Sequence, residues 1–208
     1  MALIKKHISP VIDELPSFSA LEEAYTYFQT HNGEFDKQSH AIDQISQFDG
    51  GGKLLVKLLL DNPYIHKDMI DNIASILSKM SPKRAPIESI MDLLKEKNAY
   101  IRNIGITTLQ CYGDAIKYYI VKFLIGDDRD LRIFAINVLG DVNFAESREM
   151  LVELLQNEKD INVAMTAVDY LAEIGEMQDI DLLESLKERF DDAYVVFAID
   201  NAIRQIKG

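Results

Sequence analysis

The 208-residue sequence predicts an all-α protein built from stacked helix pairs. A nine-residue pattern that begins at Ile101 returns at Leu131 and again at Val163. A period of about 30 residues is typical of supersecondary units, none of which can bury its apolar face alone. Apolar residues recur at helical spacing along most of the chain, and no stretch has the pattern of a strand.

Composition places the chain among globular proteins and limits its partners. Hydrophobic residues make up 48% and charged residues 27% of the sequence, and 34 acidic against 22 basic residues give a formal net charge of −12. A field of this sign repels nucleic acid and anionic lipid and attracts basic surfaces. We therefore expect a protein partner with a basic surface, and neither nucleic acid nor membrane as a ligand.

Cysteine usage and the start of the sequence favour the cytoplasm. Cys111 is the single cysteine, so no internal disulfide can form, as is usual in a reducing compartment. The apolar stretch that precedes Lys5 is too short for a signal peptide. The apolar blocks around Lys57 are too short to span a bilayer.

The segment 1–50 predicts two helices. The part through Pro16 reads as an extended lead-in. Ser19 and Glu22 have the spacing of a capping box, which predicts a helix that ends near Gly33. A second helix is predicted over 35–48. The glycine run at 49–52 reads as a hinge or turn.

From Lys53 onward the helices come in pairs. First helices are predicted over 53–60, 87–96, 114–125, 147–156 and 180–190. Each is followed by a second helix, the earliest over 65–80 and the last over 195–206. Placing Ile65 at the position of Ile101 gives an offset of 36, with the extra length assigned to 81–86. Glycines at the joints predict turns, at Gly113, Gly126, Gly140 and Gly175.

The second helices share the pattern apolar-Arg-x-x-small-apolar-x-x-Leu, seen from Ile101 to Leu109 and from Leu131 to Leu139. This pattern resembles the short bacterial HEAT repeats, also called PBS-lyase HEAT-like repeats. The resemblance implies a right-handed α-α superhelix, a HEAT-like solenoid of five to six antiparallel helix pairs, whose second helices line a concave surface. It further implies a single domain over 1–208, with atypical capping helices over 1–50 and repeats over 53–206.

Two features of the pattern have structural interpretations. Small residues at Gly105, Ala135 and Ala167 let neighbouring helices approach closely. We expect Arg102 and Arg132 to reach acidic turn residues of adjacent repeats, such as Asp128 or Asp130.

Sequence motifs give no support for a cofactor or metal. The glycine run ending at Lys53 lacks the spacing of a phosphate-binding loop, and the acidic run 127–130 lacks the glycine and distal glutamate of a calcium loop. Four scattered histidines form no His-Glu pair, whereas deoxyhypusine hydroxylase, built from the same repeat type, uses such pairs to bind iron. HEAT-like DNA glycosylases need a basic concave face, which this acidic chain lacks. Phycobilin lyase subunits also share the repeat, but nothing here identifies a chromophore site.

The surface of the second helices remains as the candidate site. One row of equivalent positions is polar: Asp71, Thr107, Asn137, Asp169 and Asn201. The row one turn earlier changes from polar to apolar: Lys67, Asn103, Ile133, Met165 and Phe197. Two interpretations of its apolar end stay open at this point. These side chains form an exposed strip that marks an interaction site, or they belong to the core.

The sequence thus predicts a non-catalytic scaffold that binds another protein on the concave face. The candidate partner-binding residues are Asp71, Asn103, Thr107, Ile133, Asn137, Met165, Asp169, Glu173 and Phe197. Among them, Asp71, Asp169 and Glu173 are the acidic contacts. The alternative is an enzyme, or an accessory subunit, of the lyase or hydroxylase kind, which the missing His-Glu pairs disfavour. Self-association through the apolar helix 195–206 is a further expectation.

Overall fold

The computed structural model describes residues 15–62, 65–142 and 144–208, and these are helical with no strand. The expected lead-in falls mostly on residues 1–14, outside the described residues. Twelve α-helices and three short 3-10 helices account for the ordered elements of the described residues. Within this part of the chain, no helix is both long enough and apolar enough to cross a membrane.

Contacts between Cα atoms divide the chain into two compact units, Met1–Gly51 and Gly52–Gly208. In the first unit, helices α1 (Leu21–Thr30) and α2 (Phe35–Gln47) pack against each other as a hairpin. Five apolar side chains of these two helices are buried, those of Ala24, Phe28, Ala41, Ile42 and Ile45. Burial of these apolar groups is the main source of stability for the pair.

The capping box predicted at the start of α1 pairs Ser19 with the wrong acid, Glu22. The N-cap residue is Ala20, whose side chain makes no capping bond. The backbone N–H and the hydroxyl of Ser19 both donate to Oε2 of Glu23, each at 2.9 Å. These bonds lower the pKa of the Glu23 carboxyl, the backbone bond being the larger cause. The acid one position further along the helix therefore takes the role predicted for Glu22.

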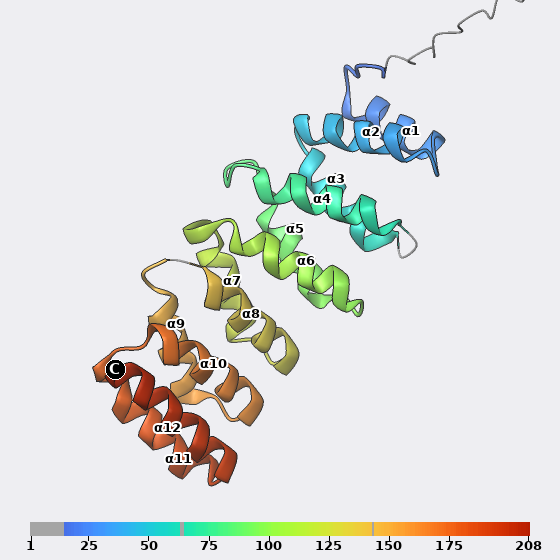
Figure 1. Cartoon of the computed structure of the whole chain (residues 1–208). Coiled ribbons are helices and arrows are strands. Elements are labelled where there is room, and N and C mark those ends of the chain that lie inside the picture. Colours follow the sequence, from blue (N-terminus) through green and yellow to red (C-terminus); the bar gives the residue numbers. More distant parts are fainter. Residues whose placement is uncertain (1–14, 63–64, 143) are drawn as a thin grey trace, which may run out of the picture. The chain divides into compact units, whose positions relative to one another are not determined.

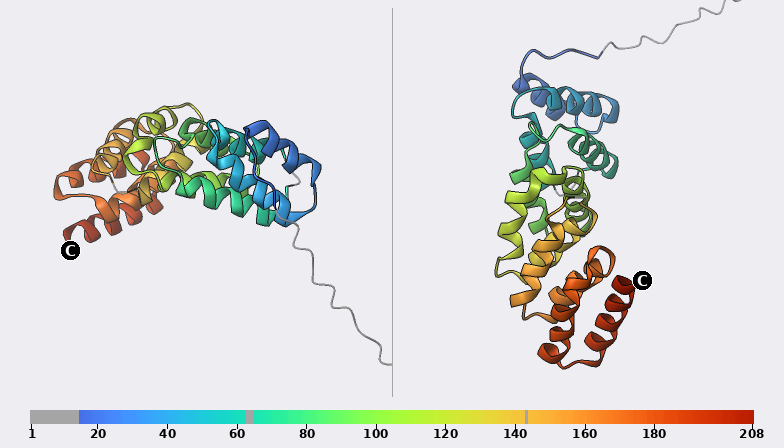
Figure 2. Two further views of the ribbon diagram at one scale, coloured as in Figure 1. Left: turned by 90° about the horizontal axis from the view of Figure 1, so that it is seen from above. Right: turned by 90° about the vertical axis from the view of Figure 1, so that its left-hand side faces the viewer.

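The second unit is a succession of five helix pairs (Figure 1 and Figure 2). The first-position helices are α3 (Gly51–Asp61), α5 (Ile87–Asp92), α7 (Lys117–Leu124), α9 (Ser147–Asn157) and α11 (Ile180–Phe190). The second-position helices are α4 (Lys67–Lys79), α6 (Ala99–Gln110), α8 (Arg129–Asp141), α10 (Ile161–Ile174) and α12 (Ala193–Lys207). The 3-10 helices η1 (Leu93–Lys95), η2 (Gly113–Ile116) and η3 (Met177–Asp179) complete the helix at α5, α7 and α11.

The second helices form a continuous layer. Helix α4 contacts α6, α6 contacts α8, α8 contacts α10, and α10 contacts α12, whereas α5 contacts α7 and α9 contacts α11 in the other layer. Buried aliphatic side chains between the layers form the core, for example Ile73, Leu109, Leu139 and Leu171. The predicted all-α solenoid is therefore confirmed, with five pairs in this unit and the α1–α2 pair in the other.

A polar residue caps each second helix, and these caps define the repeat. They are His66, Asn98, Asp128, Asp160 and Asp192. Each side chain accepts a hydrogen bond from a free backbone N–H at the helix start. The interval from His66 to Asn98 equals that from Asp128 to Asp160, so the longer offset expected for the first repeat is wrong. Met69, which is buried, takes the position of Ile101 in place of Ile65.

Two of the expected glycine turns lie inside helices. Gly140 is in the last turn of α8, where a Cβ would lie 1.8 Å from Cε1 of Tyr170. In the glycine run, Asp49 and Gly50 form a turn, but Gly51 and Gly52 are buried in the first turn of α3. A Cβ on Gly51 would lie 1.8 Å from the carbonyl oxygen of Ile45. Close packing, and not a turn, explains glycine at positions 51 and 140.

The arginines of the repeat pattern do link helices, but not through the predicted acids. Nη1 of Arg102 donates to the carbonyls of Glu96 and Lys97 at 2.8 and 3.1 Å. Arg132 donates to the equivalent carbonyls of Gly126 and Asp127 and also pairs with Glu158, which precedes α10. Neither arginine forms an ion pair with Asp128 or Asp130. Asp128 caps α8, and this use of its carboxylate explains why it is not the partner of an arginine.

Candidate functional site

The nine predicted partner-binding residues all lie on the layer of second helices. Six of them are exposed: Asp71, Asn103, Thr107, Asp169, Glu173 and Phe197. Ile133 and Asn137 are half-buried. The caps show that Asp71 is equivalent to Asn103, and that Ser75 is the first-repeat equivalent of Thr107. The polar row therefore runs Ser75, Thr107, Asn137, Asp169 and Asn201.

The structure does not form the expected exposed apolar strip. Met165 is only 4% exposed and belongs to the core, whereas Phe197 is 61% exposed. Helices α10 and α12 pack against each other more extensively than the other neighbouring second helices do. This close packing places Met165 in the interior. Met165 is therefore not available as an anchor, and the second of the two interpretations holds for it.

Two of the predicted acids belong to a larger acidic surface. Asp169 and Glu173 on α10 lie with Asp141, the last residue of α8, around the side chain of Tyr170 (the acidic surface). Burial is the main cause that raises the pKa of the Tyr170 phenol, and the negative charges of Asp141, Glu173 and Asp169 raise it further. Partial burial also raises the pKa of the Asp169 carboxyl. These four side chains therefore share one region of negative potential.

No lysine, arginine or histidine of the described residues forms an ion pair with the three carboxylates of the acidic surface. Elsewhere in the described chain, acids are commonly paired, as Glu158 is with Arg132 and Asp179 with Arg148. Charges of one sign that stay unpaired on a surface raise the local potential and attract a partner of opposite sign.

Hydrogen bonds between neighbouring repeats fix the acidic surface in place. Nε2 of Gln110 on α6 donates to the carbonyl of Asn137 at 3.0 Å and to Oδ2 of Asp141 at 2.9 Å. The Tyr170 hydroxyl donates to Oδ1 of Asn137 at 3.5 Å, and its ring covers Gly140. Asn137 is therefore engaged within the protein. The sequence pattern does not predict Asp141 and Tyr170 as site residues, because it places Gly140 and Asp141 in a turn.

Asp71 lies apart from the acidic surface. Its carboxylate accepts a hydrogen bond from the hydroxyl of Tyr100 on α6. That bond is the main cause that raises the pKa of Tyr100 to about 12. Nζ of Lys67 stands 5.4 Å from the centre of the Tyr100 ring. This nearby cation reduces the negative potential around Asp71. Because Asp71 lies on α4 and the other two predicted acids lie on α10, the structure does not bring the three together.

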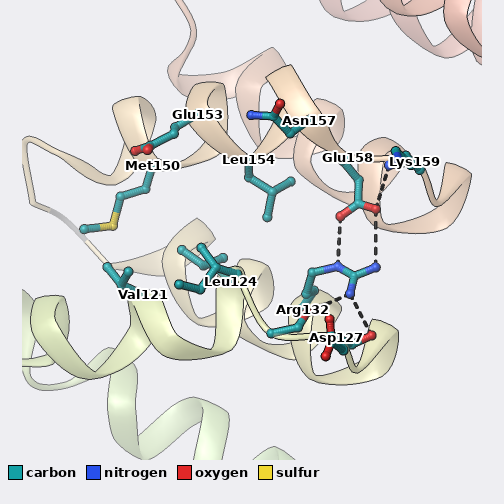
Figure 3. Close-up of a pocket in the computed structure, with 12 residues that line it drawn as sticks. Val121, Leu124, Asp127, Arg132, Met150, Glu153, Leu154, Asn157, Glu158 and Lys159 are labelled. Atoms are coloured by element: carbon teal, nitrogen blue, oxygen red, sulfur yellow. Dashed lines mark hydrogen bonds and ion pairs between the residues drawn. The ribbon is translucent and has the colours of Figure 1, made fainter.

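A pocket of about 450 Å³ opens on the other layer, between α7 and α9 (Figure 3). Val121, Leu124, Met150 and Leu154 give it apolar walls, and the Arg132–Glu158 pair closes one end. Ile125, which also lines the pocket, is 78% exposed, and Tyr118 on α7 is 83% exposed. The sequence does not predict this pocket, because its pattern places the whole of 114–125 in one packed helix.

The three histidines of the described residues and the cysteine have local structural partners. His66 caps α4, His40 approaches the carbonyl of Pro16 at 2.7 Å, and His31 approaches the carbonyl of Tyr27 at 2.9 Å. The thiol of Cys111 donates to the carbonyl of Thr107 at 3.4 Å. In the described ranges, no three His, Cys, Asp or Glu side chains are grouped so that they could hold a metal ion.

Comparison with solved structures finds repeat proteins among those similar to this chain. An engineered protein from a structural genomics consortium is 18% identical, with a TM-score of 0.42, over 89% of this chain and 96% of its own. A designed armadillo repeat protein in complex with the peptide (KR)4 is 14% identical, with a TM-score of 0.41, over 90% of this chain and 100% of its own.

Cex1p is 10% identical, with a TM-score of 0.48, over 90% of this chain; the similar part is 42% of Cex1p. No curated protein matches the chain. The family model of HEAT repeats matches residues 116–203, which hold helices α7 to α11 and most of α12. This part of the second unit is therefore similar to HEAT repeats.

Proposed function

We propose that this chain is a non-catalytic scaffold of the cytoplasm that binds another protein through its second helices, and that the partner presents lysine or arginine side chains. The observation that carries the proposal is the acidic surface. Three carboxylates, those of Asp141, Asp169 and Glu173, lie around Tyr170 without a cation of the described residues to pair with.

The physical basis is electrostatic complementarity supported by aromatic contact. An acidic surface accelerates the encounter with a basic partner and selects against acidic ones. Tyr170 supplies an aromatic side chain among the acids, and the exposed Phe197 lies on the neighbouring helix α12. Aromatic side chains are enriched at the energetic centres of interfaces, so these two are the proposed anchors.

The test is a comparison of charge reversals after a partner has been isolated from native lysate. Asp169→Lys with Glu173→Lys should abolish salt-sensitive binding. The matched control is Asp181→Lys with Glu188→Lys, which makes the same charge change at exposed positions of α11. Equally weakened binding by the two double variants would show that net charge, and not the acidic surface, attracts the partner. Undiminished binding by both would reject the electrostatic basis altogether.

Self-association through α12 is the second candidate. Tyr194 and Phe197 are 62% and 61% exposed on this helix, and Val196 lies between them. An exposed apolar face of this kind is a common interaction site. Sedimentation of the chain over a range of concentrations should show a dimer that Phe197→Asp dissociates. A monomer at all concentrations would reject this candidate and leave Phe197 to the partner.

A further inference from the structure

Arg102 and Arg132 occupy the same position in successive repeats. Each stands at the fourth position after the cap of its helix, which is Asn98 for α6 and Asp128 for α8. Each directs Nη1 at two carbonyls of the turn before the helix. For Arg102 the distances are 2.8 and 3.1 Å, and for Arg132 they are 2.8 and 3.0 Å. One half of each guanidinium is therefore held in the same way.

The Nε and Nη2 groups have different partners in the two arginines. Nε and Nη2 of Arg132 donate to the two carboxylate oxygens of Glu158 at 2.9 and 3.3 Å. Glu158 stands two positions before the cap Asp160, and the equivalent residue of the preceding repeat is Gly126. No carboxylate is supplied there, and Nε of Arg102 is buried without a hydrogen-bond partner. An unsatisfied buried donor on a charged group is costly, so its presence points to a missing acceptor.

A cavity of about 460 Å³ is lined in part by Arg102. Leu94, Leu131 and Phe134 give it apolar walls, and Lys97 adds a second cation. The guanidinium lies over the Phe134 ring, with Cζ of Arg102 4.8 Å from the ring centre. An aromatic face attracts the positive charge but does not supply the two oxygens of a carboxylate. The Nε and Nη2 groups of Arg102 are therefore still able to bind a carboxylate.

Three acids line the cavity, Glu96, Asp128 and Asp130, and two of them have partners of their own. The carboxylate of Asp128 accepts from the backbone N–H groups of Asp130 and Leu131 at 2.9 and 3.1 Å. Asp130 stands 3.4 Å from Nε of Arg129. None of the three carboxylates accepts a hydrogen bond from Arg102, so the described residues leave its Nε without an acceptor.

We propose that this cavity binds a carboxylate attached to an apolar group, with Nε and Nη2 of Arg102 in the role that they have in the Arg132–Glu158 pair. Lys97 adds positive charge, and the apolar group lies against Leu94 and Leu131. Because Nε is shielded from solvent, a lining side chain has to move on binding, and Phe134 is the one in contact with the guanidinium. The site is independent of the acidic surface and selects the opposite charge.

The test follows the Nε–H signals of the arginines by ¹⁵N NMR in the full chain. Three probes are compared: N-acetyl-leucine, which imitates a peptide C-terminus; N-acetyl-aspartate amide, which imitates an acidic side chain; and N-acetyl-leucinamide, which has no carboxylate. We expect the Arg102 signal to move saturably with a carboxylate probe, at a Kd of roughly 1 mM for so small a ligand, and not with the amide. The probe that binds more tightly identifies the source of the carboxylate.

The Arg132 signal is the internal control, because Glu158 already fills its edge, and it should stay in place. No saturable shift of Arg102 with either carboxylate probe would overturn the proposal. So would equal shifts of Arg102 and Arg132, which would indicate a general ionic-strength effect.

Filling the site from within gives a second, independent measurement. Gly126→Glu places a carboxylate at the position that Glu158 has in the next repeat. It should shift the Arg102 signal without any probe and abolish the titration. A Cβ at Gly126 lies 3.2 Å from the carbonyl oxygen of Lys122, so Gly126→Ala is needed as the control for crowding. The alanine variant should still bind the probe. Loss of binding in both variants, or in neither, would contradict the assignment.

Discussion

Arg132 and Glu158 form a two-pronged ion pair that joins the turn before α8 to the turn before α10. Nε and Nη2 of the arginine donate to the two oxygens of a carboxylate whose side chain is 7% exposed. The same carboxylate accepts from the backbone N–H groups of Lys159 and Asp160 at 2.9 and 2.8 Å. One side chain thus holds an arginine of one repeat and the start of the next helix.

Removal of this carboxylate should be strongly destabilising. Glu158→Ala leaves a largely buried guanidinium without its partner and two amides without an acceptor. We expect the free energy of unfolding, measured by urea titration, to fall by about 3–5 kcal/mol. Asp61→Ala is the control, because the ion pair of Asp61 with Lys57 is exposed and 3.9 Å long. This substitution should cost less than about 1 kcal/mol. Equal losses in the two variants would mean that the buried Arg132–Glu158 pair contributes no more to the free energy of unfolding than an exposed pair does.

Tyr112 should make the fold sensitive to alkaline pH. Its buried hydroxyl donates to the carbonyl of Leu77 on α4, and burial is the main cause that raises the pKa of the phenol. A raised folded-state pKa means that the contribution of Tyr112 to stability is complete below pH of about 10, where the unfolded phenol titrates, and is lost as pH rises further.

The comparison of the chain with Tyr112→Phe isolates this effect. At pH 7 the variant should be less stable by about 1–3 kcal/mol, because the Leu77 carbonyl loses its donor. Above pH 10 the difference in Tm should shrink and then change sign. Tyr118→Phe, at a position that is 83% exposed, should follow the unmodified chain at every pH. A constant difference between the chain and Tyr112→Phe from pH 7 to pH 11 would refute the assignment.

The sequence is sufficient to predict the helix pairs. It is not sufficient to align the second helix of the first pair with the repeat pattern. Asn98, Asp128, Asp160 and Asp192 are good cap residues at near-constant spacing, and the sequence contains this signal. Histidine is an unusual cap, so the pattern places His66 at the arginine position instead. Counting back from Asn98 by the interval that separates Asp128 from Asp160 reaches His66 and corrects the alignment.

The candidate site could be predicted only in part, because burial depends on how closely neighbouring helices pack. Asp169 and Glu173 follow from their place in the polar face of a helix. Met165 occupies the same repeat position as the exposed Phe197, yet it is buried where α10 packs against α12. Asp141 and Tyr170 meet only because Gly140 has no side chain, and one sequence without its contacts does not reveal such a pair.

Gly140 should not tolerate a side chain. Its missing Cβ position lies within 2.3 Å of three ring atoms of Tyr170, so Gly140→Ala should lower the free energy of unfolding by about 1–3 kcal/mol. If the ring is the cause, the penalty disappears in a Tyr170→Ala background. There, alanine should even stabilise α8 by about 0.5–1 kcal/mol through its higher helix propensity. Additive effects of the two substitutions in this double-mutant cycle would show that the clash is relieved elsewhere.

The acidic surface should carry a small cost in stability. Because the folded-state pKa of Asp169 is raised, its contribution to stability is complete only below the unfolded pKa of about 3.9 and is lost as pH rises through the folded value. Asp169→Asn should therefore be more stable than the unmodified chain at pH 7. The gain should be only about 0.3–0.5 kcal/mol, since the side chain is exposed to solvent screening. In 1 M NaCl most of the gain should persist, because its cause is burial and not repulsion between charges. The control substitution Asp181→Asn on α11 should leave the free energy of unfolding unchanged at both salt concentrations. A loss of stability in Asp169→Asn at pH 7 would show that the carboxylate stabilises the fold. A gain in stability together with weaker partner binding would show that the carboxylate serves binding at a cost in stability.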